Sequence, residues 1–289
     1  MANFRICALL PLYGDSEAAG LSRAIAGTLY QLGKQLDVIC DDKSWDGGSV
    51  ELDPQPYPNC IEHARNNLVR LFLAHPRQYT HALLWDSDVK PTTSGQIAPL
   101  LTRLLKADKP IIAVPYIQKS RHWVQGAQKA IEHLREHPEV TAEELGEILR
   151  GYTVRYVPDF RCEVLGEVGA DGIAEMPRHV PFGFALIKRE VFEKMTAHYK
   201  DSLRYDKDWL DDDGKPVHEE HVGLFHTGLE RRVFTMEDVA FCDRWRAMGG
   251  RLHLYLGEGA PLEHVGATSF SGTRGAMLDR AFWERHRAF

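Results

Sequence analysis

One stretch, residues 81–89 (His-Ala-Leu-Leu-Trp-Asp-Ser-Asp-Val), constrains the fold more than any other part of the chain. It is an apolar run that ends in two carboxylates, Asp86 and Asp88, separated by a single residue. An apolar run of this length between polar residues is typical of a strand buried inside an α/β sheet. Ligands of open α/β sheets bind just beyond the carboxyl ends of the strands, so we expect the two carboxylates at a ligand site.

The spacing of the two carboxylates suits a bound cation. Side chains two residues apart in an extended segment point the same way, and two carboxylates in one place repel each other unless a cation joins them. Oxygen ligands favour hard ions such as Mg²⁺ and Mn²⁺, which also bind phosphate oxygens. The alternative is an Asp-Ser-Asp turn that caps the next segment. This stretch alone does not decide between the two interpretations.

Residues 1–117 alternate between short apolar runs and helical periodicity. The apolar runs predict strands, and apolar positions that recur at helical spacing predict amphipathic helices. A strand, a helix and a second strand in succession imply parallel strands joined by a crossover helix. The predicted strands are residues 4–10, 36–40, 82–85 and 110–114, and the predicted helices are residues 16–33, 60–75 and 97–105.

Residues 118–176 are predicted to form an insertion on this core. Two charged, helix-prone segments are separated at Pro138, and Thr141 followed by Ala-Glu-Glu matches a capping box. Loosely alternating residues at 152–175 predict short strands. The insertion is either a lid or acceptor-binding element or a structural excursion, and the sequence leaves both interpretations open.

The core pattern resumes in residues 177–289, and no linker divides the chain, so we expect a single domain. The polar, acidic residues 206–226 predict a mobile surface loop. Its histidines, His218, His221 and His226, are expected to be solvated rather than bound to a metal. The other predicted elements are strands at residues 185–187 and 252–256, helices at 189–195 and after residue 237, and a C-terminal helix.

Composition narrows the classes of protein. A net charge of −6 argues against a general duplex-DNA binder. The five cysteines are scattered and form no Cys-X-X-Cys pair, which predicts a reducing compartment without a disulfide framework. Neither a signal peptide nor a membrane span is predicted, so we expect a cytoplasmic protein. The sequence has no P-loop, Gly-X-Gly-X-X-Gly or Gly-X-Ser-X-Gly pattern, which argues against triphosphate hydrolysis, dinucleotide redox chemistry and serine hydrolysis.

Two motifs resemble those of the nucleotide-sugar glycosyltransferases with a GT-A fold. Leu-Trp-Asp-Ser-Asp at residues 84–88 resembles the Asp-X-Asp motif of that family. Further along, Glu237-Asp238, Phe-Cys-X-Arg, Gly249 and His264 together resemble the Glu-Asp-X-X-Phe-Cys-X-Arg…Gly…His run of many GT-A sequences. The resemblance covers most of the chain outside the insertion and the acidic segment.

The resemblance implies a GT-A-like α/β fold with a mixed, mainly parallel sheet, flanking helices and a helical insertion. The nucleotide-binding half would be about residues 1–117, and the acceptor and catalytic half about residues 177–289. The implied activity is a metal-dependent, hexosyltransferase-like transfer of a sugar from a UDP- or GDP-sugar to an acceptor hydroxyl. The acceptor stays open between a glycan, a small molecule and modified nucleic acid. A nucleotidyltransferase on a related fold and a non-catalytic nucleotide- or sugar-binding protein are the alternatives.

The resemblance also implies a metal centre and a catalytic acid. Asp86, Asp88 and His264 would hold Mn²⁺ or Mg²⁺, and imidazole is a ligand that Mn²⁺ accepts. Asp238, with Glu237 as the second candidate, would act as general base on the acceptor hydroxyl if the reaction inverts. The alternatives are acids that stabilise the positive end of a helix and a histidine with a structural role.

The donor and acceptor contacts rest on the same resemblance. Tyr13 can stack on a base, Asp41 can accept from a ribose hydroxyl, and Arg65 can reach the nucleotide or its phosphates as a fixed cation. Turn residues, a helix salt bridge and a strand bulge are the alternatives. The predicted nucleotide-sugar contacts are Pro11, Tyr13, Asp41, Arg65, Asn66, Ser87 and Arg274, and the predicted acceptor contacts are Phe182, Gly183 and Phe184.

Overall fold

The computed structural model describes most of the predicted core. The predicted helix at residues 16–33 and the predicted C-terminal helix lie outside the described residues. The residues described are 6–10, 36–40, 43–45, 61–86, 88–93, 95–121, 123–152, 154–158, 166–210, 215–230, 233–265 and 269–270.

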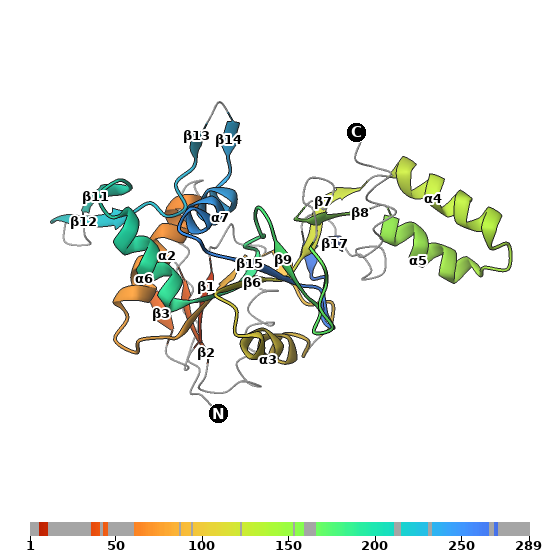
Figure 1. Cartoon of the computed structure of the whole chain (residues 1–289), viewed down its shortest axis with the longest axis horizontal. Coiled ribbons are helices and arrows are strands. Elements are labelled where there is room, and N and C mark those ends of the chain that lie inside the picture. Colours follow the sequence, from red (N-terminus) through yellow and green to blue (C-terminus); the bar gives the residue numbers. More distant parts are fainter. Residues whose placement is uncertain are drawn as a thin grey trace.

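An eight-stranded mixed sheet forms the centre of the fold (Figure 1). In order across the sheet, its strands are β3 (Lys43–Trp45), β2 (Leu36–Cys40), β1 (Ile6–Leu10), β4 (His81–Trp85), β10 (Phe184–Lys188), β6 (Ile111–Ala113), β15 (Leu252–Tyr255) and β9 (Ile173–Met176). β1 pairs in parallel with β2 and with β4, as the strand–helix–strand pattern predicted. β10 is antiparallel to both β4 and β6, and β6 is parallel to β15. The carboxyl ends of β1, β4, β6 and β15 therefore lie at one edge.

Helices cover both faces of this sheet because the central strands are apolar on both sides. In β4, Ala82 and Leu84 pack with α2, α6 and α7 on one face, whereas Leu83 and Trp85 pack with α3 on the other. This confirms the layered α/β class that the apolar pattern predicted. The flanking helices are α2 (Ile61–Ala74), α3 (Ile97–Ala107), α6 (Arg189–Tyr199) and α7 (Glu237–Ala247).

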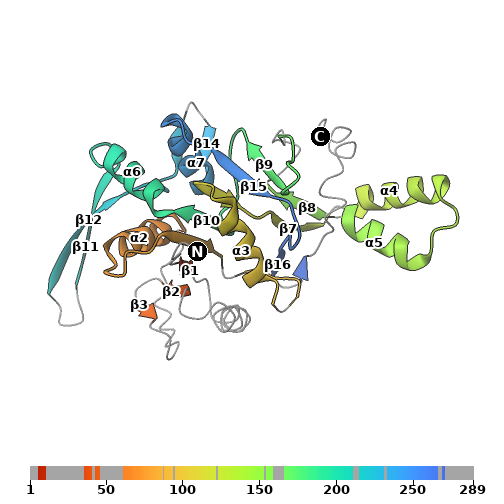
Figure 2. The ribbon, with the colours of Figure 1, turned by 60° about the horizontal axis from the view of Figure 1, so that its bottom comes forward.

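A helical arm projects from the sheet (Figure 2). Its base is the antiparallel pair β7 (Tyr116–Arg121) and β8 (Val154–Val157), and its helices are α4 (Trp123–Glu136) and α5 (Ala142–Tyr152). The two predicted helices are confirmed, and so is the capping box, since the Glu144 N–H donates to Thr141 Oγ1 at 3.2 Å. The arm is shorter than the predicted insertion, because the last four residues of residues 118–176 form β9 in the main sheet.

The prediction of a mobile loop at residues 206–226 is wrong. Two strands, β11 (Arg204–Leu210) and β12 (Pro216–Val222), pair there as an antiparallel hairpin. Most of their residues are polar or charged, so the alternation lacked the apolar positions by which strands are recognised. Lys207 instead faces Glu219 across the pair, and such cross-strand pairs of opposite charge stabilise a hairpin. One facing pair, Asp206 and Glu220, carries like charges.

The three histidines of residues 206–226 differ from one another in their surroundings. His218 is largely exposed, with its Nδ1 2.6 Å from Asp208 Oδ1, which raises the pKa of His218. His221 was expected to be solvated, but it is buried, and its ring centroid lies 5.3 Å from that of Tyr205. His226 is exposed, as expected.

Two smaller strand groups bring distant segments to the edge at which β4 ends. β16 (Glu263–Val265) pairs with β5 (Val89–Lys90) and with β17 (Ser269–Phe270), so it joins the C-terminal part of the chain to the residues that follow β4. The hairpin of β13 (Gly228–Glu230) and β14 (Val233–Thr235) leads into the start of α7. In the parts of the chain described above, no helix is long and apolar enough to cross a membrane.

Candidate functional site at the carboxyl edge of the sheet

A tight turn follows β4 and carries the two predicted carboxylates. The N–H of Val89 donates to the carbonyl of Asp86 at 3.0 Å, and the indole N–H of buried Trp85 donates to the carbonyl of Val89 at 2.8 Å. The turn is thereby fastened to the strand. A backbone turn, as in the alternative interpretation of this stretch, therefore joins Asp86 to Val89, and Asp86 and Asp88 lie at the edge where ligands of α/β sheets bind.

His264 lies beside Asp88 because β16 pairs with β5, with His264 opposite Val89. Nε2 of His264 is 3.1 Å from Oδ2 of Asp88, and Nδ1 is 2.8 Å from the carbonyl oxygen of Ile117. Because a carbonyl can only accept, Nδ1 must carry a hydrogen. In the neutral imidazole, the lone pair of Nε2 then faces the carboxylate, and a proton or a metal ion must lie between them for this contact to be favourable.

Asp88 has a second close neighbour, and this one is a cation. Nζ of Lys119, which belongs to β7, lies 2.6 Å from Oδ2 of Asp88. Burial would raise the pKa of Asp88, but the hydrogen bonds with His264 and Lys119 outweigh it and lower the pKa to about 2. Asp88 is therefore ionised at neutral pH.

Asp86 faces Arg65 instead of His264. One Arg65 nitrogen lies 2.9 Å and 3.2 Å from the two carboxylate oxygens of Asp86, and another lies 2.9 Å from Glu237. The Arg65 side chain is 3% exposed and lies over the rings of Phe182 and Phe225. Arg65 is therefore not exposed to a nucleotide-sugar, as the resemblance implied, and its ion pairs are not on the surface, as the alternative implied. Burial raises the pKa of Asp86 and of Glu237, although the charge of Arg65 opposes that rise.

The two acids at the start of α7 have different partners. Glu237 is held by Arg65, whereas an oxygen of Asp238 accepts the N–H of Val239 at 2.7 Å. Among the residues that the structure describes, no cation lies within 4.0 Å of Asp238. Both acids are partly exposed, and both lie at the positive end of the helix, which favours their ionised forms.

Tyr116 connects the two halves of the site, although the sequence did not predict it. Its ring lies edge-on to that of His264, with 5.1 Å between the ring centroids. Burial, together with the nearby charge of Asp86, raises the pKa of Tyr116. Gly183 lies against the same ring, and its carbonyl accepts the N–H of Asp86 at 3.0 Å. Tyr116 and Lys119 follow a predicted strand, so the carboxyl-edge rule that selected Asp86 could also have selected them.

Three predicted contacts lie inside the core. Phe182 and Phe184 are fully buried, packed against Phe241 and Trp85 respectively, so neither ring has a face open to an acceptor sugar. Asn66 is also buried, and its Oδ1 accepts the N–H of Phe225 at 3.0 Å. The two aromatic rings therefore serve as core packing, a role that differs from both the predicted acceptor contact and the strand bulge given as its alternative. The predicted contacts that lie outside the described residues are Pro11, Tyr13, Asp41, Ser87 and Arg274.

The side chains of the site supply some, but not all, of the ligands that a hard metal ion needs. No three His, Cys, Asp or Glu side chains within the described ranges are gathered to hold a metal ion as they stand. Asp88 and His264 nevertheless form a carboxylate–imidazole pair, and the carbonyl of Ile117 orients the imidazole in the manner of metal-ligating histidines. Mg²⁺ is commonly bound by one or two carboxylates and completes its coordination shell with water and substrate phosphates. Asp88 and His264 could therefore supply the protein ligands of such an ion.

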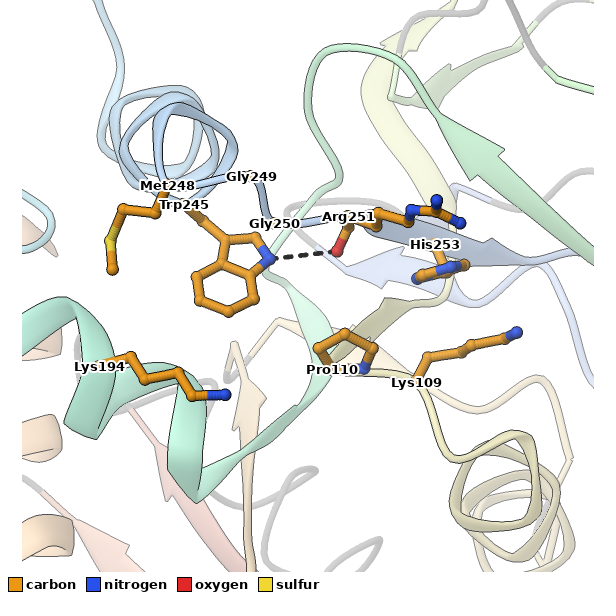
Figure 3. Close-up of a pocket in the computed structure, with 9 residues that line it drawn as sticks. All are labelled: Lys109, Pro110, Lys194, Trp245, Met248, Gly249, Gly250, Arg251 and His253. Carbon is orange, nitrogen blue, oxygen red and sulfur yellow. Dashed lines mark hydrogen bonds between the residues drawn. The ribbon is translucent and has the colours of Figure 1, made fainter.

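A separate hollow of about 510 Å³ lies at the opposite edge, where β6 and β15 begin (Figure 3). Its lining includes Lys109, Lys194 and Arg251, and the indole N–H of Trp245 donates to the Arg251 carbonyl at 3.2 Å. None of the predicted site residues lines it. The acids and the histidine therefore mark the candidate site, and this hollow does not.

Together, the fold and the acidic edge define an α/β protein with a mixed central sheet, flanking helices and a candidate ligand site beyond β4. Neither a protein-family model nor a curated protein sequence matches this chain.

Replacing Gly183 by Ala should disturb the site through Tyr116. The new Cβ would lie 2.5 Å from Cε1 and 2.7 Å from Cζ of that buried ring. We expect a loss of about 1–3 kcal/mol in the free energy of unfolding, measured by chemical denaturation. Gly146→Ala is the control, because nothing lies within 4 Å of its Cβ and α5 should gain about 0.5–1 kcal/mol. Equal effects of the two changes would contradict the close contact.

Proposed function

We propose that this chain is a metal-dependent glycosyltransferase with a GT-A-like fold, which transfers a sugar from a UDP- or GDP-sugar to an acceptor hydroxyl. The contact between Asp88 and His264 carries the proposal. A carboxylate and an imidazole whose N–H is already committed to the Ile117 carbonyl present two lone pairs to one place. This arrangement suits a divalent cation at the edge of the sheet where a nucleotide would bind.

The residues of the site divide between donor and acceptor. Asp88 and His264, with Asp86 beside them, would hold Mn²⁺ or Mg²⁺, which neutralises the diphosphate leaving group when bound. Arg65 keeps Asp86 and Glu237 in place through its two ion pairs. Asp238 is the better candidate for general base, because Arg65 forms an ion pair with Glu237, whereas no cation among the described residues lies within 4.0 Å of Asp238.

Nucleotide binding should depend on the metal. In calorimetry, UDP or GDP is expected to bind the wild-type protein with Mn²⁺ or Mg²⁺ present and to bind far more weakly in EDTA. His264→Ala should lower Mn²⁺ affinity by about tenfold or more, because it removes a ligand. Equal nucleotide affinity with and without EDTA would refute the metal bridge.

The matched control for this test is His253→Ala. His253 is buried, and its Nδ1 lies 3.2 Å from the carbonyl of Ile111, but it lies in β15, away from Asp86 and Asp88. We expect it to lose about 1–3 kcal/mol of stability through the buried hydrogen bond and to leave Mn²⁺ affinity unchanged. If His264→Ala behaves like this control, His264 has a structural role.

A further inference from the structure

One oxygen of Asp88 is shared by two side chains from different segments. Oδ2 lies 2.6 Å from Nζ of Lys119 and 3.1 Å from Nε2 of His264. A divalent cation held by Asp88 and His264 would therefore occupy the neighbourhood of the Lys119 ammonium. Two positive charges repel strongly at such distances, and more so at a half-buried site than in water. Metal and ammonium thus compete for the same carboxylate.

Lys119 is able to leave Asp88. Its side chain is 36% exposed and has four flexible carbon–carbon bonds, so the ammonium can turn towards solvent while the backbone of β7 stays in place. Arg65, which also lies at this edge, has no such freedom, because its side chain is 3% exposed and held by both Asp86 and Glu237.

The strand that carries Lys119 is part of the site. β7 also supplies Tyr116, whose ring packs on His264, and the Ile117 carbonyl that orients the imidazole. A ligand bound beside Asp88 therefore lies within reach of Lys119. The chemistry that an ammonium group would recognise there is a phosphate oxygen on the metal-bound side of a nucleoside diphosphate.

We infer that Lys119 is an internal counter-ion: it neutralises Asp88 in the metal-free protein, and it binds the diphosphate of the nucleotide once a divalent cation has taken Asp88. This inference rests on the proposed metal-dependent function. If Lys119 only bound phosphate, or only paired with Asp88, its loss would not change both affinities. As a counter-ion with both roles, its loss should raise metal affinity and lower nucleotide affinity.

The test compares Lys119→Met with the wild-type protein by calorimetry. Titrated with Mn²⁺ alone, the variant should bind about fivefold more tightly or better, because the competitor is gone. Titrated with UDP, and separately with GDP, at saturating Mn²⁺, it should bind the nucleotide about tenfold more weakly or worse, because a charged hydrogen bond is lost. Lys119→Arg keeps the charge and should leave both affinities near those of the wild type.

Lys129→Met is the matched control, because Lys129 makes an ion pair of the same 2.6 Å length, with Glu132, in α4 of the same arm. It should change neither affinity, and thermal unfolding should show all three variants folded. Mn²⁺ affinity that is unchanged or lower in Lys119→Met, while the wild type binds Mn²⁺, would overturn the role of Lys119 alone. A wild-type protein that binds neither Mn²⁺ nor nucleotide would overturn the proposed function and this inference with it.

Discussion

Replacing Asp238 by Asn is expected to slow sugar transfer by about 10²–10⁴-fold while leaving nucleotide affinity close to that of the wild type. The amide keeps the shape of the side chain but cannot take a proton from an acceptor hydroxyl. General-base catalysis acts in the transition state and contributes little to donor binding, so kcat should fall and the affinity for UDP or GDP should not.

Donor hydrolysis, in which water replaces the acceptor, supplies the measurement for Asp238→Asn. A panel of UDP- and GDP-sugars is incubated with Mn²⁺, and release of the nucleotide is followed. Asp243→Asn is the matched control, since Asp243 lies on the exposed side of the same helix and pairs with Arg246 at 3.4 Å. If Asp238→Asn loses nucleotide affinity or unfolds, Asp238 is a donor ligand or a helix cap instead.

Removal of Arg65 should have the largest effect on stability. Arg65→Met leaves Asp86 and Glu237 without their buried cation, and breaking a buried ion pair in this way costs about 3–5 kcal/mol. Arg246→Met replaces a side chain that is 40% exposed and should change the free energy of unfolding by no more than about 0.5 kcal/mol. Chemical denaturation of both variants at pH 7 makes the comparison.

The deficit of Arg65→Met should shrink as the pH falls. Burial already raises the pKa of Asp86 and of Glu237, and loss of the Arg65 charge removes the main opposing effect. An acid whose pKa is raised by folding destabilises the folded state above its unfolded-state pKa of about 4, and the penalty disappears once both states are protonated. A deficit that stays constant from pH 7 to pH 4 would mean that lost packing, and not the unpaired carboxylates, causes the instability.

Local patterns predicted the elements whose signals are local. α2, α3 and α7 lie where apolar residues recur at helical spacing, and β4 lies where an apolar run ends in charge. The β11–β12 hairpin was missed because its stabilising pairs are charges on opposite strands, which become neighbours only when the strands pair. The edge strand β9 was assigned to the insertion because nothing in its four residues indicates pairing with β15.

The candidate site divides in the same way. The apolar pattern was enough to place Asp86 and Asp88 beyond a buried strand, and the resemblance to GT-A motifs selected Asp238 and His264 as further site residues. Their contacts depend on segments far apart in sequence: β16 pairs with β5, and Arg65 of α2 meets Glu237 of α7. Phe182, Phe184 and Asn66 were expected at the site because their burial is not visible in the local sequence. That burial depends on helices from other parts of the chain that cover them.

The sequence by itself determined the α/β class, the parallel pairing around β1 and the acidic end of β4, because hydrophobic periodicity and strand polarity are local properties of the chain. The tertiary structure alone decided which charges meet. Asp86 lies against Arg65, and Asp88 lies between Lys119 and His264. The physical reason is that Coulomb interactions and hydrogen bonds act over a few ångströms in space, whereas the partners are brought to that distance only by sheet pairing and helix packing.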